Sequence, residues 1–323
     1  MRKEDLRIVF MGTPAFAVES LKALVENGYN VVGVITMPDK PAGRGYKMQP
    51  SEVKKYAMEH NLFLLQPEKL KNETFLNELQ QLKADLQIVV AFRMLPEVVW
   101  NMPRYGTFNL HASLLPQYRG AAPINWAIIN GEKETGVTTF FLSHEIDTGK
   151  IIFQEKVPIA DTDNAGSLHD KLMTVGAGMV LKTVDAIIDG SVNAISQNEL
   201  IVHEADLHAA PKIFKETCRI DWQETPEKIH NLVRGLSPYP GAWTELEVSE
   251  GNWVNLKIYK TEIILANHNL SVGSILSDGK SYMDVAVKGG FIRILELQAA
   301  GKKRMAVKDF LNGIILPEHP CVK

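Results

Sequence analysis

The sequence predicts an α/β protein: a mostly parallel sheet with helices on both faces, followed by a small C-terminal β-barrel. Three features predict this class. Short, continuous apolar runs alternate with segments of helical periodicity up to about residue 190. A polar, irregular stretch follows, and after it come strand-like segments separated by glycine-containing turns. We therefore expect two domains, residues 1–190 and 210–323, joined by a linker over residues 191–209.

The first strand, helix and strand set the pattern of the N-terminal domain. The apolar run at residues 7–11 predicts a buried strand. Thr13 is predicted to cap the next helix, with Pro14 at its first position and Gly28 at its end. Residues 31–36 are again continuously apolar and rich in β-branched side chains. This order, with strands that are apolar on both faces, is typical of a parallel sheet covered by helices.

Later segments continue this alternation. Three more apolar runs predict strands, and two periodic segments ended by glycine predict helices. The predicted strands are residues 86–92, 106–112 and 137–143, and the predicted helices are residues 122–131 and 167–190.

The C-terminal region has a different character. Residues 225–236 predict one short amphipathic helix. Strand-like segments follow, separated by the turn signals EGN, SDGK and KGG, and short strands at such spacing are typical of a small barrel. These segments are residues 243–248, 253–265, 271–276 and 281–297.

Composition indicates an ordinary globular protein. The chain has 323 residues, of which 45% are hydrophobic and 23% charged, and its formal net charge of −3 argues against a dedicated nucleic-acid coat protein. Residues 1–207 carry five more acidic than basic side chains, whereas residues 208–323 carry two more basic than acidic ones. The C-terminal part can therefore face a polyanion, although an ordinary solvated surface also explains so small an excess.

Cysteine content and hydropathy bear on location. Cys218 and Cys321 are too few for a disulfide framework, which favours a reducing compartment. The N-terminus lacks the apolar core of a signal peptide, and no stretch approaches the roughly 20 apolar residues of a membrane span. We expect a cytoplasmic protein that does not enter a membrane, and a monomer because nothing in the sequence demands a partner.

Two common kinds of site are disfavoured. The first strand-to-helix turn, FMGTPAF, has a single glycine and lacks the G-x-G-x-x-G fingerprint, which argues against a nicotinamide-dependent dehydrogenase. No group of histidines and cysteines has the spacing of zinc ligands, and His319 and Cys321 near the C-terminus are interpreted as incidental. We expect no metal.

The stretch NLHASLLPQYRG, residues 109–120, carries the strongest chemical signal. In an extended strand Asn109 and His111 project to one side and Leu110 to the other. They lie near the C-terminal end of a predicted strand, the edge at which open α/β sheets bind ligands. An amide can stabilise an oxyanion and an imidazole can accept a proton, a pairing that suits acyl transfer to an amine. Alternatively, the two side chains only satisfy each other and the nearby backbone.

Two loops flank this strand. Pro116 and Gly120 make the segment after His111 a loop that can form a pocket wall. The turn HEIDTG, residues 144–149, supplies Asp147, whose carboxylate can orient or charge-stabilise His111. The alternative is that Asp147 and Thr148 do no more than form an Asx-type turn.

Together, Asn109, His111, Asp147 and the loop SLLPQYRG resemble the signature of the folate-dependent formyltransferases. The segments FMGTPAFAV, PDKPAGRGYKMQPSEVK, RGAAPINWAIINGEKETGVT and DTG occur in the order typical of those members that act on initiator tRNA charged with methionine. The resemblance spans essentially the whole chain and is strongest over residues 8–150.

The resemblance implies a Rossmann-like catalytic domain, a linker, and a barrel similar to the oligonucleotide-binding (OB) fold. It also implies transfer of the formyl group of 10-formyltetrahydrofolate to the α-amino group of methionyl initiator tRNA, a step in translation initiation. Asn109, His111 and Asp147 are then the catalytic residues. The implied folate-binding stretch is Ser113, Leu114, Leu115 and Pro116.

Two basic segments are the predicted tRNA contacts. The loop of residues 37–47, with Lys40, Arg44 and Lys47, resembles the family's insertion that enters the acceptor stem. A basic loop beside a pocket can contact phosphates, although an ordinary exposed loop is the simpler explanation. Likewise, Lys302, Lys303 and Arg304 are either phosphate contacts or solvated charge.

Three other functions are alternatives to formylation of methionyl initiator tRNA. A formyltransferase acting on glycinamide ribonucleotide is expected to end near the first domain, so the long C-terminal region counts against it. A formyltransferase acting on a sugar-nucleotide amine can carry a similar second domain. A non-catalytic RNA-binding protein would leave Asn109, His111 and Asp147 without a purpose, and a formyl-transfer assay distinguishes it.

Overall fold

The computed structural model describes residues 2–42 and 47–323, and it divides the chain into two compact units. Unit 1 comprises Met1–Gly120, Glu134–Pro158 and His169–Ala209. Unit 2 comprises Ala121–Lys133, Ile159–Leu168 and Ala210–Lys323. The functional boundaries expected at residues 190 and 210 stay a prediction.

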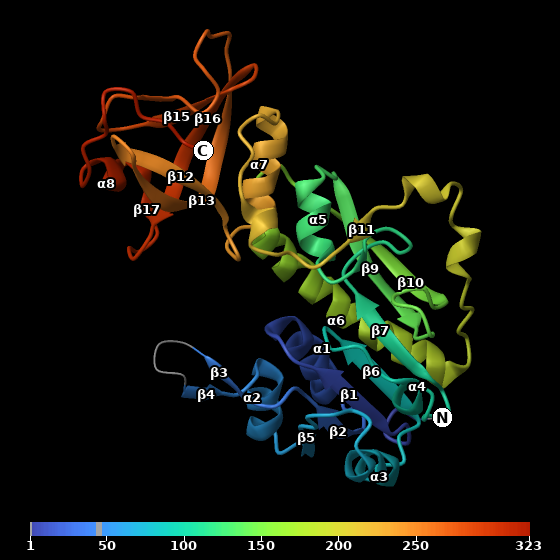
Figure 1. Cartoon of the computed structure of the whole chain (residues 1–323). Coiled ribbons are helices and arrows are strands. Elements are labelled where there is room, and N and C mark those ends of the chain that lie inside the picture. The colour runs from blue at the N-terminus through green and yellow to red at the C-terminus, as the bar shows by residue number, and fades with distance from the viewer. Residues whose placement is uncertain (1, 43–46) are drawn as a thin grey trace. The chain divides into compact units, whose positions relative to one another are not determined.

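Unit 1 is built on a seven-stranded sheet with the order β10-β9-β7-β6-β1-β2-β5 (Figure 1). The pairs β1–β2, β1–β6, β2–β5 and β6–β7 are parallel, whereas β9 and β10 run antiparallel at one edge. The mostly parallel, Rossmann-like sheet predicted from the apolar runs is therefore confirmed. The strands are β1 (Ile8–Gly12), β2 (Val31–Ile35), β5 (Leu64–Leu65), β6 (Leu86–Val90), β7 (Thr107–His111), β9 (Glu134–Phe141) and β10 (Ile151–Pro158).

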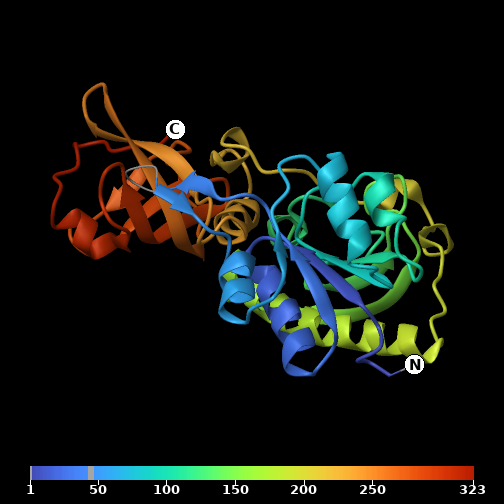
Figure 2. The ribbon, with the colours of Figure 1, turned by 90° about the horizontal axis from the view of Figure 1, so that it is seen from below.

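Helices cover both faces of this sheet, as Figure 2 shows. On one face, Phe75 and Val99 of α3 and α4 belong to the same buried cluster as Val9, Met11 and Val89 of the strands. Such burial on both sides explains why β1 and β6 are apolar throughout. The helices are α1 (Ala15–Glu26), α2 (Glu52–Glu59), α3 (Glu73–Gln81), α4 (Glu97–Trp100) and α6 (Ala165–Asp189).

The opposite face is covered by α1 and by α6 from residue 169 onward. Phe16 of α1 and His169 of α6 make an edge-to-face ring contact with centroids 5.3 Å apart. In α6 a Cβ at Gly176 would lie only 2.7 Å from Leu110 Cδ2, so this glycine allows α6 to approach β7 closely. Leu110 thus faces α6, and its two neighbours in β7 face the other way.

The start of α1 differs from the prediction. Pro14, not Thr13, occupies the N-cap position, and no side chain caps the helix. The Thr13 side-chain oxygen is buried without a hydrogen-bond partner among the described residues, while its carbonyl accepts the N–H of Val53 at 3.4 Å. Because the Thr13 backbone makes this tertiary contact, the Thr13 side chain does not cap the helix.

Several segments of unit 1 lie outside the predicted elements, among them β5, α3 and α4. The strand β10, which is also outside the predicted elements, lies at the sheet edge, and its middle is exposed, so its apolar signal is weak. The predicted loop of residues 37–47 contains part of a hairpin, in which β3 (Lys40–Ala42) pairs antiparallel with β4 (Lys47–Gln49).

Unit 2 contains a curled antiparallel sheet with the order β12-β13-β16-β15-β14, and β17 also pairs with β16. Register shifts near Lys260 interrupt the ladder between the two longest strands, and such bulges bend a sheet. This half-barrel agrees with the predicted OB-like architecture. The strands are β12 (Ala242–Ser249), β13 (Asn252–Leu265), β14 (Ile275–Ser277), β15 (Met283–Val287), β16 (Gly290–Ala299) and β17 (Met305–Ala306).

The last residues of the chain connect the two edges of this curled sheet. The N–H of Glu247 in β12 donates to the Cys321 carbonyl at 3.0 Å, and the N–H of Ile275 in β14 donates to the Pro320 carbonyl at 2.9 Å. Edge strands with free backbone groups invite aggregation, and the terminal segment occupies both edges at these points.

Three helices complete unit 2. The predicted helix near residues 225–236 is confirmed as α7 (Pro226–Gly235), which is capped by the side chain of Thr225. The helix α5 (Pro123–Ile129) packs on it, and Asn125 Nδ2 donates to the Gly235 carbonyl at 2.8 Å. The third helix is α8 (Val307–Leu311).

The irregular segment after α6 has little regular structure. It contains the short 3₁₀ helices η1 (Gln197–Glu199) and η2 (Glu204–Asp206) and the two-residue strand β11 (Ala209–Ala210). The remaining short elements are β8 (Arg119–Gly120) and the 3₁₀ helix η3 (Glu216–Cys218). Over residues 2–42 and 47–323, no helix combines the length and the apolar character needed to cross a membrane.

Candidate active site

The candidate site begins on β7, which lies between the parallel strand β6 and the antiparallel strand β9. Asn109 and His111 share the face turned away from α6, as the alternation of a strand requires. His111 is 7% exposed. The amide oxygen of Asn109 is buried and has no hydrogen-bond partner among the described residues, an uncommon state for a buried polar atom.

The hydrogen bonding of His111 distinguishes its two ring nitrogens. Nε2 lies 2.9 Å from the backbone carbonyl of Tyr118, and because a carbonyl only accepts, Nε2 carries a proton. Nδ1 lies 3.8 Å from Oδ2 of Asp147, which is too far for a hydrogen bond but close for an ion pair. In the neutral ring the lone pair is therefore on Nδ1, the nitrogen that faces the carboxylate.

Asp147 sits in a tight turn after β9. Its φ of 55° lies in the left-handed region, which aspartate tolerates better than most residues. Its Oδ2 accepts the backbone N–H of Gly120 at 2.9 Å. The turn itself is closed by Thr148, whose hydroxyl donates to the Glu145 carbonyl at 3.1 Å. The carboxylate thus interacts outside its own turn, toward His111 and Gly120.

The segment predicted to bind folate is largely buried within unit 1. Ser113, Leu115 and Pro116 are buried, and Leu114 is half-buried. The Ser113 hydroxyl donates to the Gln117 carbonyl at 2.6 Å, and the N–H of Leu115 donates to the Thr138 hydroxyl at 3.2 Å. These contacts hold the loop in place beside His111, and folate binding by its residues stays a prediction.

The predicted tRNA contacts lie in both units. Lys40 is exposed in β3, Lys47 begins β4, and Arg44 lies outside the described residues. In unit 2, Lys302 and Lys303 are exposed in the turn before β17.

Arg304, the third residue of the predicted unit 2 contact, already has protein partners. Its guanidinium pairs with Glu296 and lies 4.5 Å from the centroid of the Tyr259 ring. Lys302 and Lys303 therefore offer the less encumbered charges of this turn.

Unit 2 also holds pairs of cations and aromatic rings that lie far apart in the sequence. Lys215 and Arg219 lie over the ring of Trp243, at 5.7 Å and 5.3 Å from its centroid. Lys323 lies 3.9 Å from the centroid of Trp253. Adjacent positive charge and aromatic surface are typical of nucleic-acid binding proteins. These residues are scattered over the sequence, so only the folded sheet brings them together.

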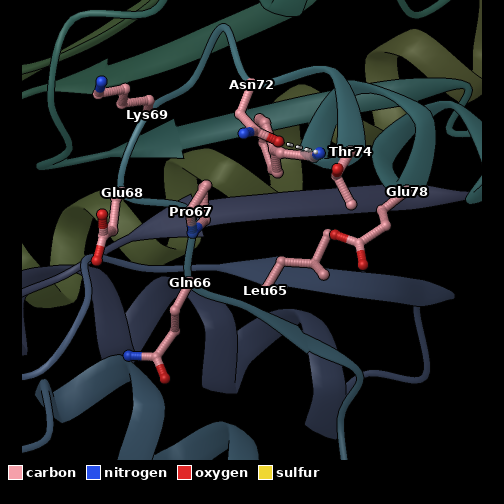
Figure 3. A pocket seen from close by; sticks show the side chains of 9 residues that line it. Leu65, Gln66, Pro67, Glu68, Lys69, Asn72, Thr74 and Glu78 are labelled. Atoms are coloured by element: carbon pink, nitrogen blue, oxygen red, sulfur yellow. Dashed lines mark hydrogen bonds between the residues drawn. The ribbon is translucent and has the colours of Figure 1, made fainter.

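A separate hollow of about 440 Å³ opens between β5 and α3 (Figure 3). Of the described residues that line it, none is a predicted site residue. In Figure 3 the polar ends of Gln66, Glu68 and Lys69 point in different directions. Gln66 is instead engaged with the base of the 40–49 hairpin, since its Nε2 donates to Asp39 at 2.9 Å. These three polar side chains therefore do not converge on one point of the hollow, as the polar groups of a binding site do.

Among the described residues, no three or more side chains of His, Cys, Asp or Glu form a group able to hold a metal ion. The expectation of no metal stays a prediction.

Comparison with known proteins extends these observations. A family model described as formyl transferase matches residues 6–184, and a model described as the C-terminal domain of formyl transferases matches residues 212–314. A methionyl-tRNA formyltransferase of Parabacteroides distasonis is 68% identical over 97% of this chain and 97% of its own length. One of Bacteroides thetaiotaomicron is 64% identical over 98% of both chains.

Solved structures share the fold at much lower identity. The sugar 3N-formyl transferase WlaRD, solved with dTDP and 5-N-formyl-THF, has a TM-score of 0.64 at 22% identity and covers 92% of this chain and 99% of its own. HypX from Aquifex aeolicus in complex with tetrahydrofolic acid has a TM-score of 0.61 at 19% identity and covers 97% of this chain and 48% of its own. At these identities the likeness establishes the fold alone.

Proposed function

This chain belongs to the formyl transferase family, and we propose that Asn109, His111 and Asp147 are the centre at which it formylates its substrate. The activity is formyl transfer to methionyl-tRNA, as in relatives that are 60% or more identical along nearly the whole chain. The proposed donor is 10-formyltetrahydrofolate and the proposed acceptor is the initiator methionyl-tRNA. Because that acceptor is used where translation begins, the cytoplasm is the proposed location, and a monomer is the proposed state.

The chemistry needs one proton to move as one bond replaces another. The α-amino group of the esterified methionine has a pKa of about 8, so a usable neutral fraction exists near neutral pH. Its nitrogen attacks the formyl carbon, a new C–N bond forms, and the bond from that carbon to the folate nitrogen breaks. The attacking nitrogen loses a proton, and the departing folate nitrogen gains one. A group that accepts and then returns a proton is sufficient, with no covalent enzyme intermediate.

His111 fits this proton relay, and its geometry is the observation that carries the proposal. With Nε2–H donated to the Tyr118 carbonyl, Nδ1 is the nitrogen able to accept a proton. Asp147 Oδ2, 3.8 Å away, would stabilise the positive charge created there. Both nitrogens of the imidazolium would then face an acceptor.

Asn109 is proposed to bind the oxyanion formed at the formyl oxygen. It shares a face of β7 with His111, and its Nδ2 is the group able to donate to an oxyanion. A side-chain amide held in a rigid central strand can donate N–H to developing negative charge without reorganisation.

Other residues are proposed to bind the two substrates. Ser113, Leu114, Leu115 and Pro116 are proposed to bind the folate, supported by their position directly after the His111 strand. Lys40, Arg44, Lys47, Lys302, Lys303 and Arg304 are proposed to contact tRNA phosphates. Residues 1–190 are then the catalytic domain, residues 191–209 the linker and residues 210–323 the tRNA-binding domain.

The test is formylation of methionyl initiator tRNA with 10-formyltetrahydrofolate as donor, comparing wild type with His111→Ala. We expect the variant to lose about 100-fold to 10,000-fold in rate, the usual contribution of a general acid or base. His319→Ala, an exposed histidine of unit 2, is the matched control and should retain the wild-type rate.

Two outcomes would contradict different parts of the proposal. If folded wild-type protein transfers no formyl group to the tRNA, the acceptor is wrong, and sugar-nucleotide amines are the next acceptors to assay. If the tRNA is formylated and His111→Ala is unimpaired, the site is wrong while the function stands.

A further inference from the structure

Gln197 is a buried polar residue in the segment that joins the two regions matched by the family models. Those matches end at residue 184 and resume at residue 212. Gln197 begins η1 and is 1% exposed. Burying an amide is costly unless its donors and acceptor are satisfied, so its partners are informative.

The side chain of Gln197 makes four hydrogen bonds to two loops. Nε2 donates to the backbone carbonyls of Asp147, at 2.8 Å, and Gly149, at 2.9 Å. Oε1 accepts from Arg119, from Nε at 3.0 Å and from Nη2 at 2.6 Å. An amide has two N–H groups and two lone pairs, so this arrangement uses its whole capacity.

These two loops also meet at the candidate site. Gly120, which follows Arg119, donates its N–H to the carboxylate of Asp147, and that carboxylate faces His111. Gln197 therefore links the loop of Arg119 to the turn of Asp147 through its hydrogen bonds to both. It holds Asp147 through the backbone and leaves the carboxylate for Gly120 and His111.

The segment that carries Gln197 is itself anchored in unit 1. Ile195 and Ile151 of β10 exchange two backbone hydrogen bonds, each of 2.9 Å. Ser196 and Glu199 form a capping box around η1. Gln197 is thus presented from a fixed backbone, as a residue that positions others must be.

We propose that Gln197 is a positioning residue for formyl transfer, which sets the Asp147 turn against the Arg119–Gly120 loop so that the carboxylate faces His111. This inference rests on the proposed function of Asp147 and His111. The left-handed backbone of Asp147 is uncommon for a residue other than glycine, and the hydrogen bonds from Gln197 to the Asp147 and Gly149 carbonyls help to keep it.

The test uses kcat and KM for methionyl initiator tRNA in Gln197→Ala and Gln197→Glu. Gln197→Glu keeps the side-chain size and an acceptor for Arg119, but it places a carboxylate oxygen where two carbonyls require a donor. We expect each variant to lower kcat about 10-fold to 100-fold, the usual effect of a misplaced catalytic group, with KM for the tRNA little changed. Asn198→Ala, the exposed neighbour in η1, is the control and should behave as wild type.

A double-mutant cycle with Asp147→Asn separates positioning from a general loss of structure. If Gln197 acts through Asp147, then Gln197→Ala should lower kcat much less in the Asp147→Asn background than in wild type. Each variant is assayed well below its own melting temperature.

Two results would overturn the inference. One is an unchanged kcat in both Gln197 variants, and the other is the same fold-loss in both backgrounds. If wild type formylates the tRNA and Asp147→Asn is impaired, either result leaves the proposed function intact. If wild type is inactive on the tRNA, the proposed function itself fails.

Discussion

The proposed catalytic residues of unit 1 and the basic turn of unit 2 differ in how the fold holds them. His111 and Asp147 have side chains only 7% and 12% exposed, and backbone groups bind both. Lys302 and Lys303 are exposed to the solvent. Buried polar groups interact strongly and depend on small displacements, whereas exposed charges are screened. We therefore expect large, position-dependent effects in the first region and small, salt-dependent effects in the second.

Apart from His111→Ala, the largest effect that would test this comparison is expected at Asn109. Asn109→Ala should lower kcat by about 100-fold to 1000-fold, the usual cost of losing one oxyanion donor. The measurement is steady-state formylation of methionyl initiator tRNA, with circular dichroism to establish folding. Asn101→Ala, an exposed asparagine at the end of α4, serves as the control. A rate within a few-fold of wild type would remove Asn109 from the proposed site.

A smaller loss is expected from crowding the Asp147 turn without touching a proposed catalytic side chain. A Cβ at Gly149 would lie 1.6 Å from the carbonyl oxygen of Phe141, so Gly149→Ala must displace the turn. We expect a loss of about 1–3 kcal/mol in the free energy of unfolding, as for other overpacked sites, measured by denaturant titration. Activity should fall about 10-fold or more because Asp147 moves.

The control for this substitution is Gly178→Ala in α6. A Cβ at Gly178 would meet nothing within 4 Å, and the position is exposed in a helix. It should stabilise the protein by about 0.5–1 kcal/mol. If Gly149→Ala behaved like this control, the turn would not depend on the close approach to Phe141.

The smallest effect is expected in the basic turn of unit 2. Replacing both Lys302 and Lys303 by alanine should raise KM for the tRNA a few-fold and leave kcat unchanged. If each lysine contacts one phosphate, the slope of log KM against log salt should change by about 1 per lysine. Lys280→Ala, in another exposed turn of unit 2, should change neither quantity. A large loss of kcat in the double variant would contradict the expectation that these exposed charges affect tRNA binding alone.

Local sequence signals predicted much of the fold correctly. The apolar runs of β1 and β6 indicated strands buried on both faces, and both are. The amphipathic pattern of residues 225–236 indicated α7, and in the structure the Thr225 side chain caps this helix. Thr13 carried a capping signal, but a contact with Val53 from a later helix decided the local geometry instead.

By itself, the sequence determined the alternation of strands and helices, the family signature, and the common face of Asn109 and His111. These properties depend on neighbours within a few residues, where periodicity and capping act directly. For Asp147 the sequence left two interpretations, an Asx-type turn or an interaction with His111, and the tertiary structure places its carboxylate 3.8 Å from His111. Only the tertiary structure brought Gln197 to both Arg119 and the Asp147 turn. Contacts between residues so far apart in the chain depend on which surfaces pack together, and no local pattern encodes that choice.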